Sequence, residues 1–282
     1  MTYRGKILLK DVSKIIKLAL EEDLKKGDIT SEAIFKNNDL SSAEIISKQT
    51  GIFCGSDLVK HIYSLINPKI KVTALIKDGN RLNKNQPVIK IMGPTKNILA
   101  GERIALNFIQ RMSGIASKTN EYVSILNKSK IKILDTRKTG PGLRLLDKYA
   151  VKTGGGTNHR MGLYDLVMIK DNHLKAAGSL TQAVELVRKK YKSKYKIEVE
   201  VSNLKEVEEA RTLPIDIIML DNMNKKNIQK AINLIAGQKK IEVSGTINQK
   251  KLKYLKDLKV DFISVGSLTH SVQAFDFSLK FR

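Results

Sequence analysis

Charged and hydroxyl side chains recur along the second half of the chain, each time at the end of a short apolar run. The runs are rich in β-branched residues, so each one predicts a buried strand. If these strands are parallel, their carboxyl ends meet at one edge and the side chains there form one constellation. The residues at these ends are Asp135 with Arg137 and Lys138, then Lys170, Glu200, Asp221, Ser244 with Gly245, and Gly266 with Ser267.

Cations dominate this predicted edge. Arg137, Lys138 and Lys170 come from strand ends, and His159 and Arg160 come from the loop between the first two runs. Like charges repel, so the group is costly unless a polyanionic ligand neutralises it. Arginine suits bidentate pairing with carboxylate or phosphate, and lysine supplies a point charge. The pattern predicts a substrate set that is both phosphorylated and carboxylated.

Glu200 and Asp221 supply the acidic counterpart. Carboxylates at this position suit ribose hydroxyls or a magnesium ion that is shared with pyrophosphate. In the run KIEVEV, Glu198 points to the same side as Glu200, because side chains alternate along a strand. We expect Glu198 to support its neighbour or to serve the structure.

Glycines mark two different kinds of turn. After the last two runs, VSGTIN and SVGSLTHS combine glycine with hydroxyl side chains, which favours phosphate binding at the final loops of a barrel over an ordinary turn. No phosphate-loop signature occurs elsewhere, and GPGLRL lacks the third small residue of a dinucleotide fingerprint. We expect Gly154 to Gly156 to turn the chain after a helix, so that His159 and Arg160 face Lys170.

Strand-like runs alternate with helical segments through the second half of the chain. This alternation predicts parallel βα units, and six of them favour a barrel over an open sheet. Upstream, the residues up to about 112 combine helices with glycine-punctuated strands, and a helical region over 97–126 is expected to be interrupted near Ser113 and Gly114. Asp28 or Thr30 is available to cap a short helix, and Asn203 with Glu206 resembles a capping box. The predicted strands are 131–135, 165–171, 196–201, 216–221, 241–245 and 261–266.

Composition excludes several classes of protein. No apolar run approaches the roughly 20 residues that span a bilayer, and acids interleave the amphipathic N-terminus, so we expect a cytoplasmic protein without a membrane partner. Cys54 is the only cysteine, which rules out a disulfide within the chain and predicts a small buried side chain. The four histidines lack zinc-type spacing. The net charge of +23 raises the alternative of a nucleic-acid-binding protein, but the lysines are scattered and aromatics are only 5%, so no nucleic acid is expected.

The residues resemble those of the quinolinate phosphoribosyltransferase family, also called nicotinate-nucleotide pyrophosphorylases (carboxylating), over nearly the whole chain. The matching blocks are ALEEDLKKGDITS, GERIALNFIQRMSGIAS, ILDTRKTGPGLRLLDKYAVKTGGGTNHRMGLYDLVMIKDNH, IEVEVSNLKEVEEA, IMLDNM, IEVSGTIN and DFISVGSLTHS. The resemblance implies an N-terminal α/β sandwich over 1–112, completed by the tail 269–282, and an incomplete α/β barrel resembling a TIM barrel over 113–268. It also implies condensation of quinolinate with phosphoribosyl pyrophosphate to nicotinate mononucleotide, pyrophosphate and carbon dioxide in NAD biosynthesis, with Mg²⁺, in a homodimer. Assembly beyond the dimer is left open by the sequence.

The resemblance also implies roles for single residues. Arg103 would reach quinolinate from the partner subunit. Lys138, Glu200 and Asp221 would carry the catalysis and bind phosphoribosyl pyrophosphate. Glu200 and Asp221 are also the candidate ligands of the metal. Thr246 stands where glycine or asparagine is common in the family. The quinolinate set is Arg103, Thr136, Arg137, His159, Arg160 and Lys170, and the set for the 5′-phosphate is Ser244, Gly245, Thr246, Val265, Gly266 and Ser267.

Two related functions compete with this interpretation. They are a pyrophosphorylase-like paralogue encoded with molybdate transport genes and a phosphoribosyltransferase that uses nicotinate. The rivals differ in the carboxylates that they bind, and the full set of cations favours the dicarboxylate quinolinate.

Overall fold

Residues 9–127 and 129–282 are described by the computed structural model, and they form two compact units. The sandwich unit holds the described residues up to Asn120 together with Thr139–Gly155 and Leu268–Arg282. The barrel unit holds Glu121–Lys138 and Gly156–Ser267. The predicted domain boundary between residues 112 and 113 falls inside the helix Thr95–Ile125, and it stays a prediction.

The sandwich unit is built on a four-stranded antiparallel sheet with the order β12-β1-β5-β3, beside a short two-stranded ladder. Its strands are β1 (Leu40–Ser47), β3 (Lys71–Ala74), β5 (Pro87–Pro94) and β12 (Phe277–Phe281), and the ladder is β2 (Gly51–Ile52) with β4 (Arg81–Leu82). Alternate residues face one side and are buried, as where Ile45 lies opposite Ile89 of β5 and Leu279 of β12. The C-terminal tail thus completes the sheet of this unit.

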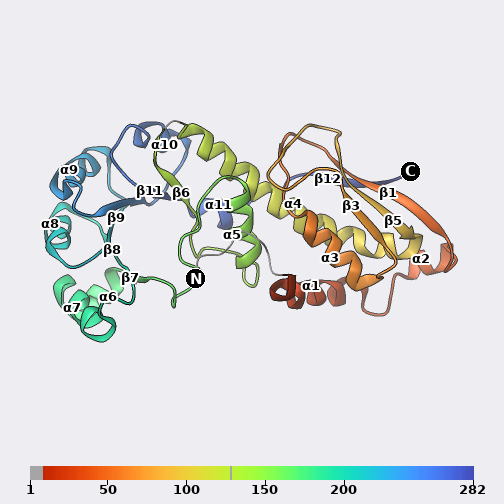
Figure 1. Cartoon of the computed structure of the whole chain (residues 1–282), viewed down its shortest axis with the longest axis horizontal. Helices are drawn as coiled ribbons and strands as arrows, with labels where there is room; N and C mark the ends of the chain where they lie inside the picture. Colours follow the sequence, from red (N-terminus) through yellow and green to blue (C-terminus); the bar gives the residue numbers. More distant parts are fainter. Residues whose placement is uncertain (1–8, 128) are drawn as a thin grey trace. The chain divides into compact units, whose positions relative to one another are not determined.

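Figure 1 shows α3 and α4 on one face of this sheet, in a unit that holds five helices up to α5. The helices are α1 (Leu9–Leu24), α2 (Ile29–Ile34), α3 (Ser56–Ile66), α4 (Thr95–Ile125), whose first 26 residues lie in this unit, and α5 (Arg144–Thr153). The Asp28 carboxylate accepts the N–H groups of Thr30 and Ser31, which confirms the predicted cap of α2. Cys54 is fully buried, as predicted.

The predicted interruption of the long helix near Ser113 and Gly114 was wrong, because α4 continues through both residues. Gly114 serves packing instead. A Cβ atom at Gly114 would lie 2.2 Å from the carbonyl oxygen of Gln273, in the C-terminal tail. Two residues further along the tail, the Phe275 N–H donates a hydrogen bond to the Gln110 carbonyl of α4 at 2.8 Å. Glycine therefore lets the tail backbone cross the helix in contact.

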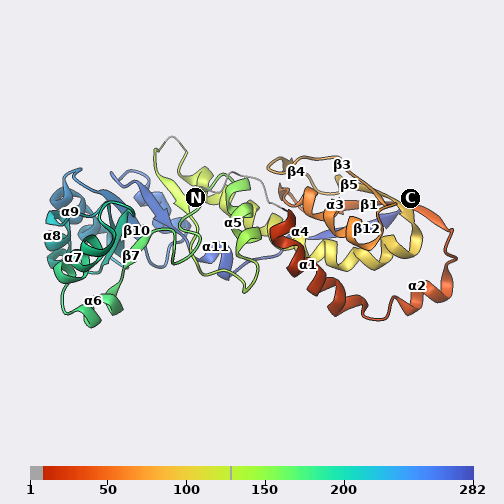
Figure 2. The ribbon, with the colours of Figure 1, turned by 60° about the horizontal axis from the view of Figure 1, so that its bottom comes forward.

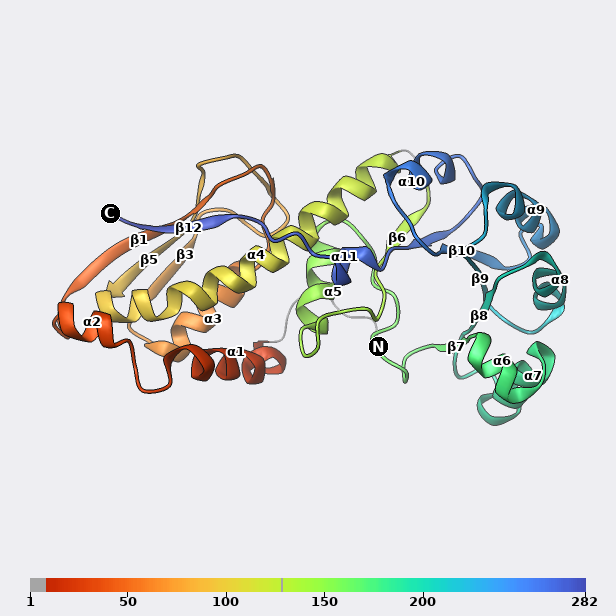
Figure 3. The same ribbon diagram turned by 180° about the vertical axis from the view of Figure 1, so that it is seen from behind.

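The barrel unit contains six parallel strands in the order β6-β11-β10-β9-β8-β7. They are β6 (Lys132–Leu134), β7 (Val167–Ile169), β8 (Ile197–Val201), β9 (Ile217–Asp221), β10 (Lys240–Ser244) and β11 (Phe262–Ser264), which confirms all six predicted strands. Neighbours in sequence are neighbours in the sheet except that β6 and β7 do not pair in the part of the chain described. This is the expected incomplete α/β barrel, and Figure 3 shows the strands in an open arc.

Helices between the strands cover the outside of the arc (Figure 2). Three of them, α8, α9 and α10, begin after asparagine caps. The side chains of Asn203, Asn224 and Asn248 each accept a hydrogen bond from the backbone N–H three residues later in the chain. The Glu206 carboxylate returns its bond to the Ser202 N–H rather than to Asn203, so the box is a variant. The helices are α6 (Asp171–Ala177), α7 (Leu180–Tyr191), α8 (Leu204–Thr212), α9 (Lys225–Ile235) and α10 (Gln249–Leu255), and α11 (Ser267–His270) follows β11.

Within the described residues, every helix is too short or too polar to cross a membrane.

Replacement of Gly114 tests the contact between tail and helix. In an exposed helix interior, glycine to alanine stabilises by about 0.5–1 kcal/mol. We expect Gly114→Ala to reverse this sign and lower the free energy of unfolding by about 2 kcal/mol, since the added methyl overlaps backbone. Chemical denaturation followed by circular dichroism measures the change. Asn107→Ala, at an exposed position of the same helix, is the control and should cost nothing. A Gly114→Ala variant as stable as the parent would contradict the contact.

Candidate active site at the carboxyl ends of the barrel strands

The six parallel strands bring polar residues to one edge of the barrel unit. Ser244 lies directly opposite Asp221 in the register of β9 and β10, and Glu200 lies one layer below, opposite Met219. The structure therefore collects in one unit nearly all the residues that the sequence predicted. Those at the strand ends or in the loops that follow them are Thr136, Arg137, Lys138, His159, Arg160, Lys170, Glu200, Asp221, Ser244, Gly245, Thr246, Val265, Gly266 and Ser267.

Lys170 and Glu200 form an ion pair between neighbouring strand ends. The Lys170 ammonium contacts Oε2 of Glu200, and the two side chains are 40% and 16% exposed. A half-exposed pair of this kind contributes little stability, because water screens it. Its effect is positional: each charge is held at the edge where a ligand would arrive.

Arg160 is a buried cation, with 9% of its surface exposed. Burial and the charge of Arg137 lower the pKa of its guanidinium, and Glu198 and Asp165 oppose them. Its Nη1 donates to the Leu166 carbonyl at 3.0 Å. A buried guanidinium group that is repelled by an exposed one favours binding of an anion there.

Residues after β6 lie close to each other in a tight turn. The Lys138 N–H donates to the Thr136 hydroxyl at 3.1 Å, and both Arg137 and Lys138 are exposed. The hydroxyl of Thr136 thus orders the backbone from which these two cations project.

Two residues near Asp221 were missed by the sequence analysis. Asn222 donates to the Asp221 carboxylate at 2.7 Å, and the Lys251 ammonium donates to the Gly245 carbonyl at 2.7 Å. Burial lowers the pKa of Lys251, and Asp221 opposes this shift. Asn222 stands next to the predicted Asp221, but Lys251 lies in the first turn of α10, where no local pattern marks it.

The turn after β10 has an unusual backbone. Gly245 has φ +89°, and a Cβ there would lie 2.1 Å from Oδ1 of Asn222. Thr246 follows with φ +43°, a left-handed conformation that glycine and asparagine adopt at lower cost. Thr246, where the resemblance leads us to expect glycine or asparagine, therefore lies at a strained position.

The end of β11 is anchored to the first strand of the barrel. The Val265 N–H donates to the Leu134 carbonyl at 2.9 Å, and the Val265 side chain is buried. Gly266 and Ser267 follow at half-buried positions. Val265 thus supports the turn through its backbone and its packing.

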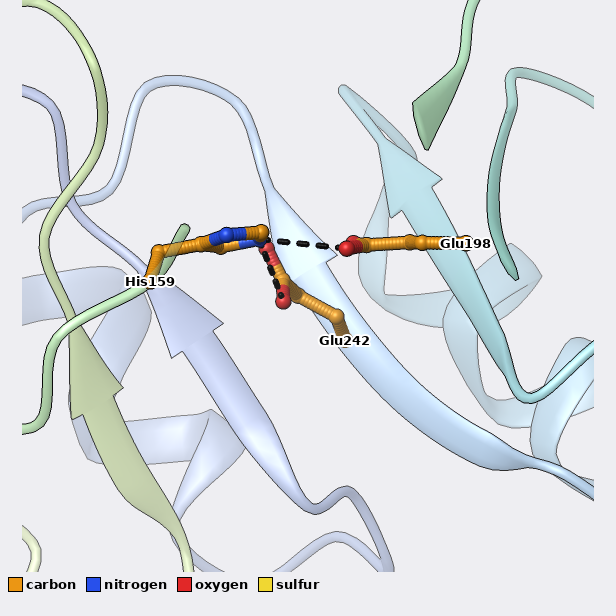
Figure 4. A group of neighbouring side chains, drawn as sticks. All are labelled: His159, Glu198 and Glu242. Carbon is orange, nitrogen blue, oxygen red and sulfur yellow. Dashed lines mark ion pairs between the residues drawn. The ribbon is translucent and has the colours of Figure 1, made fainter. Parts of the chain in front are cut away.

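His159 lies inside the barrel unit with two buried glutamates. Its Nε2 is 3.2 Å from Oε2 of Glu198 and 3.4 Å from Oε2 of Glu242. Figure 4 shows the three side chains pointing toward one another, the glutamates from two different strands. Glu242 was missed, although a carboxylate within the apolar run IEVSG was a signal that could have marked it.

Burial acts on the charges of this cluster in opposite directions. It would lower the pKa of His159, but Glu198 and Glu242 outweigh it and raise the pKa. Burial raises the pKa of Glu198, with Glu242 adding to the shift and His159 opposing it. The His159 Nδ1 accepts the Arg160 N–H at 2.7 Å, so we assign the ring proton to Nε2, where the carboxylates favour it.

Arg103 lies on α4 in the sandwich unit, where its side chain is exposed. Its predicted role as a ligand from the partner subunit stays a prediction.

An open barrel of parallel strands with polar side chains at their carboxyl ends is the arrangement of α/β-barrel enzymes. Two family models match this chain in succession, "Quinolinate phosphoribosyl transferase, N-terminal domain" over residues 28–113 and the C-terminal domain of the same name over 115–280. The chain therefore belongs to the quinolinate phosphoribosyltransferase family.

Individual relatives agree with this assignment. The chain is 42% identical to the "Probable nicotinate-nucleotide pyrophosphorylase [carboxylating]" of Bacillus subtilis (strain 168), over 95% of this chain and 92% of that protein. It is 39% identical to the "Quinolinate phosphoribosyltransferase [decarboxylating] 2b, mitochondrial" of Nicotiana tabacum, over 96% and 82%. The solved structure of NadC from Streptococcus pyogenes matches with a TM-score of 0.94 at 40% identity, covering 98% of this chain and 99% of that one.

Two glycines allow the turn after β10 to be tested. Gly237 also has a positive φ, +77°, but a Cβ there would meet nothing within 4 Å. We expect Gly237→Ala to cost about 1–2 kcal/mol for the left-handed backbone. Gly245→Ala should cost about 1–3 kcal/mol more, because its methyl overlaps Asn222. Equal losses in denaturant melts of the two variants would contradict the close contact at Gly245.

Proposed function

We propose that this protein is a quinolinate phosphoribosyltransferase, a pentosyltransferase that converts quinolinate and phosphoribosyl pyrophosphate into nicotinate mononucleotide, pyrophosphate and carbon dioxide. Membership of the family supports the reaction. The observation that carries it to this chain is the collection of cations, carboxylates and a glycine turn at one edge of the barrel unit. The product supplies NAD biosynthesis.

The cations are the proposed site for the two carboxylates of quinolinate. Arg137 and Arg160 repel each other, so a bound dianion relieves an existing cost. Lys170 would add a point charge, with Thr136 nearby and Arg103 reaching in from a partner subunit of a homodimer. Our prediction that His159 also contacts quinolinate stays a prediction, since both of its ring nitrogens face protein groups.

Phosphoribosyl pyrophosphate is proposed to bind beside this set. Lys138 would pair with its pyrophosphate, and Glu200 and Asp221 would face the ribose. The two final turns would hold the 5′-phosphate, since their backbones are fixed before a ligand arrives. The residues of these turns are Ser244, Gly245, Thr246, Val265, Gly266 and Ser267.

Glu200 and Asp221 fit a magnesium ion in the chemistry of their donor atoms. Both offer carboxylate oxygens at neighbouring strand ends, and Mg²⁺ binds proteins through one or two carboxylates together with substrate phosphates. Bound Mg²⁺ would neutralise charge on the pyrophosphate. Magnesium, the homodimer and the cytoplasmic location remain proposals.

The proposed mechanism is electrostatic. The bond from C1 of the ribose to pyrophosphate breaks with its electron pair on pyrophosphate, while the pyridine nitrogen bonds to C1. Glu200 and Asp221 stabilise the positive charge that develops on the ribose, and Lys138 stabilises the leaving group. The adjacent carboxyl group then leaves as carbon dioxide, its electron pair stays on the ring carbon, and that carbon takes a proton. No covalent protein nucleophile is required.

One assay tests the function. Purified protein is mixed with phosphoribosyl pyrophosphate, magnesium and either quinolinate or nicotinate, and nicotinate mononucleotide and carbon dioxide are measured. We expect product and stoichiometric carbon dioxide with quinolinate only, because the site offers charges for two carboxylates. Turnover with nicotinate alone would favour the rival phosphoribosyltransferase. Inactivity with both, together with salt-dependent binding of DNA or RNA, would favour the nucleic-acid alternative.

Replacement of Arg160 tests the dicarboxylate site. Arg160→Ala should reduce kcat/KM for quinolinate by about 10²-fold or more, since a buried charge-assisted pair with the ligand is lost. Arg211→Ala is the control, because Arg211 pairs with Glu208 on the surface of α8. Its kcat/KM should equal that of the parent. An unchanged rate in Arg160→Ala would remove that residue from the site.

A further inference from the structure

Two buried glutamates of the barrel unit have no task in the proposed reaction. Glu198 and Glu242 are completely buried, on strands β8 and β10. The Glu242 Oε1 accepts a hydrogen bond from the Ser264 hydroxyl of β11. Two buried carboxylates are costly unless other groups compensate for them, so their presence calls for a compensating partner. That partner is the imidazole of His159.

A histidine between two carboxylates also resembles a metal site, but the hydrogen bonds oppose this interpretation. The Arg160 N–H donates to Nδ1 at 2.7 Å, which leaves the ring proton on Nε2. A protonated Nε2 cannot ligate a metal. It lies within ion-pair distance of Glu198 and Glu242, whose Oε2 atoms are 3.2 and 3.4 Å away. The cluster is therefore arranged to hold the ring.

The ring links this cluster to Arg160. Asp135 accepts the His159 N–H at 2.9 Å, and the Asn158 amide donates to the same carboxylate. The backbone of His159 is thus held by Asp135, and its ring lies against the two glutamates. Between them, Nδ1 accepts the backbone N–H of Arg160. A shift of the ring would move this backbone and the guanidinium attached to it.

We propose that Glu198 and Glu242 are positioning residues for quinolinate: they hold the His159 ring, which fixes the backbone of Arg160 and so aims its guanidinium at the substrate. The inference rests on the proposed function and names the parts that support its dicarboxylate site. Glu198 also stabilises the Arg160 cation directly, because its charge raises the pKa of Arg160 against the effect of burial.

Steady-state kinetics of alanine and glutamine variants test the proposal. Glu198→Ala and Glu242→Ala should raise KM for quinolinate by about 10-fold to 100-fold, as small displacements of a binding group do, and leave KM for phosphoribosyl pyrophosphate within about twofold. Glu198→Gln and Glu242→Gln should recover most of the loss, because an amide oxygen of the same reach can accept the Nε2 proton. If an alanine variant does not fold, the corresponding Glu→Asp variant, which is one methylene too short, is judged by the same criterion.

Val243→Ala controls for loss of stability alone. Val243 is buried on β10 beside Glu242, and its side chain points to the opposite face of the strand. This variant should lose stability and keep the KM of the parent for quinolinate. An equal rise of KM in Val243→Ala would show a general effect of destabilisation and overturn the proposal.

A double-mutant cycle tests whether the glutamates act through Arg160. If they do, Glu242→Ala should raise KM for quinolinate much less in an Arg160→Lys background than in the parent, since the aim of the guanidinium no longer matters. Full additivity would overturn the proposal. Turnover of quinolinate by the parent protein, measured first, tests the proposed function separately: an inactive parent refutes both, whereas an active parent with unchanged KM in the glutamate variants refutes only the positioning role.

Discussion

The parallel register of the barrel strands is the constraint on which the candidate site depends. Side chains alternate along a strand, so a slip of one residue would turn every inward group outward. In β8 the outward positions Ile197, Val199 and Val201 are completely buried, and they fix the register by their packing. Because side chains alternate along the strand, Glu198 and Glu200 must then point inward. The apolar residues of this strand thus decide where its carboxylates lie.

Charges at two depths of the barrel unit are compensated in different ways. At the strand ends, Lys170 and Glu200 are partly exposed, so water screens them and a ligand can exchange with them. Glu198 and Glu242 are completely buried with His159 as a close partner, and removal of one member would leave a buried charge uncompensated. Arg160 connects the two levels: it is buried, repelled by Arg137 and attracted by Glu198. An anionic ligand completes this balance from the solvent side.

Much of this arrangement could be predicted from the sequence, for a physical reason. Alternating apolar runs and caps are local signals, so all six barrel strands and the Asp28 and Asn203 caps were found. Gly114 was misread because the glycine is required by a tail segment far away in the chain, and local propensity carries no trace of that contact. Lys251 was missed for the same reason, as was the contact between Glu242 and His159. The roles of Arg103 and the metal depend on groups outside a single chain, and the sequence supports them only by resemblance.

The incompleteness of the barrel and the position of His159 have one cause. In the described part of the chain β6 and β7 do not pair, and the edge of β6 is met instead by Thr157, whose N–H donates to the Ile133 carbonyl at 2.8 Å. The segment around Thr157, which belongs to the connection from β6 to β7, thus occupies the edge of β6 where a neighbouring strand would pair in a closed barrel. Its next residues, Asn158 and His159, bind Asp135 directly after that strand. A closed ladder would use these backbone groups for strand pairing, so the open position is what lets the imidazole reach the glutamates inside.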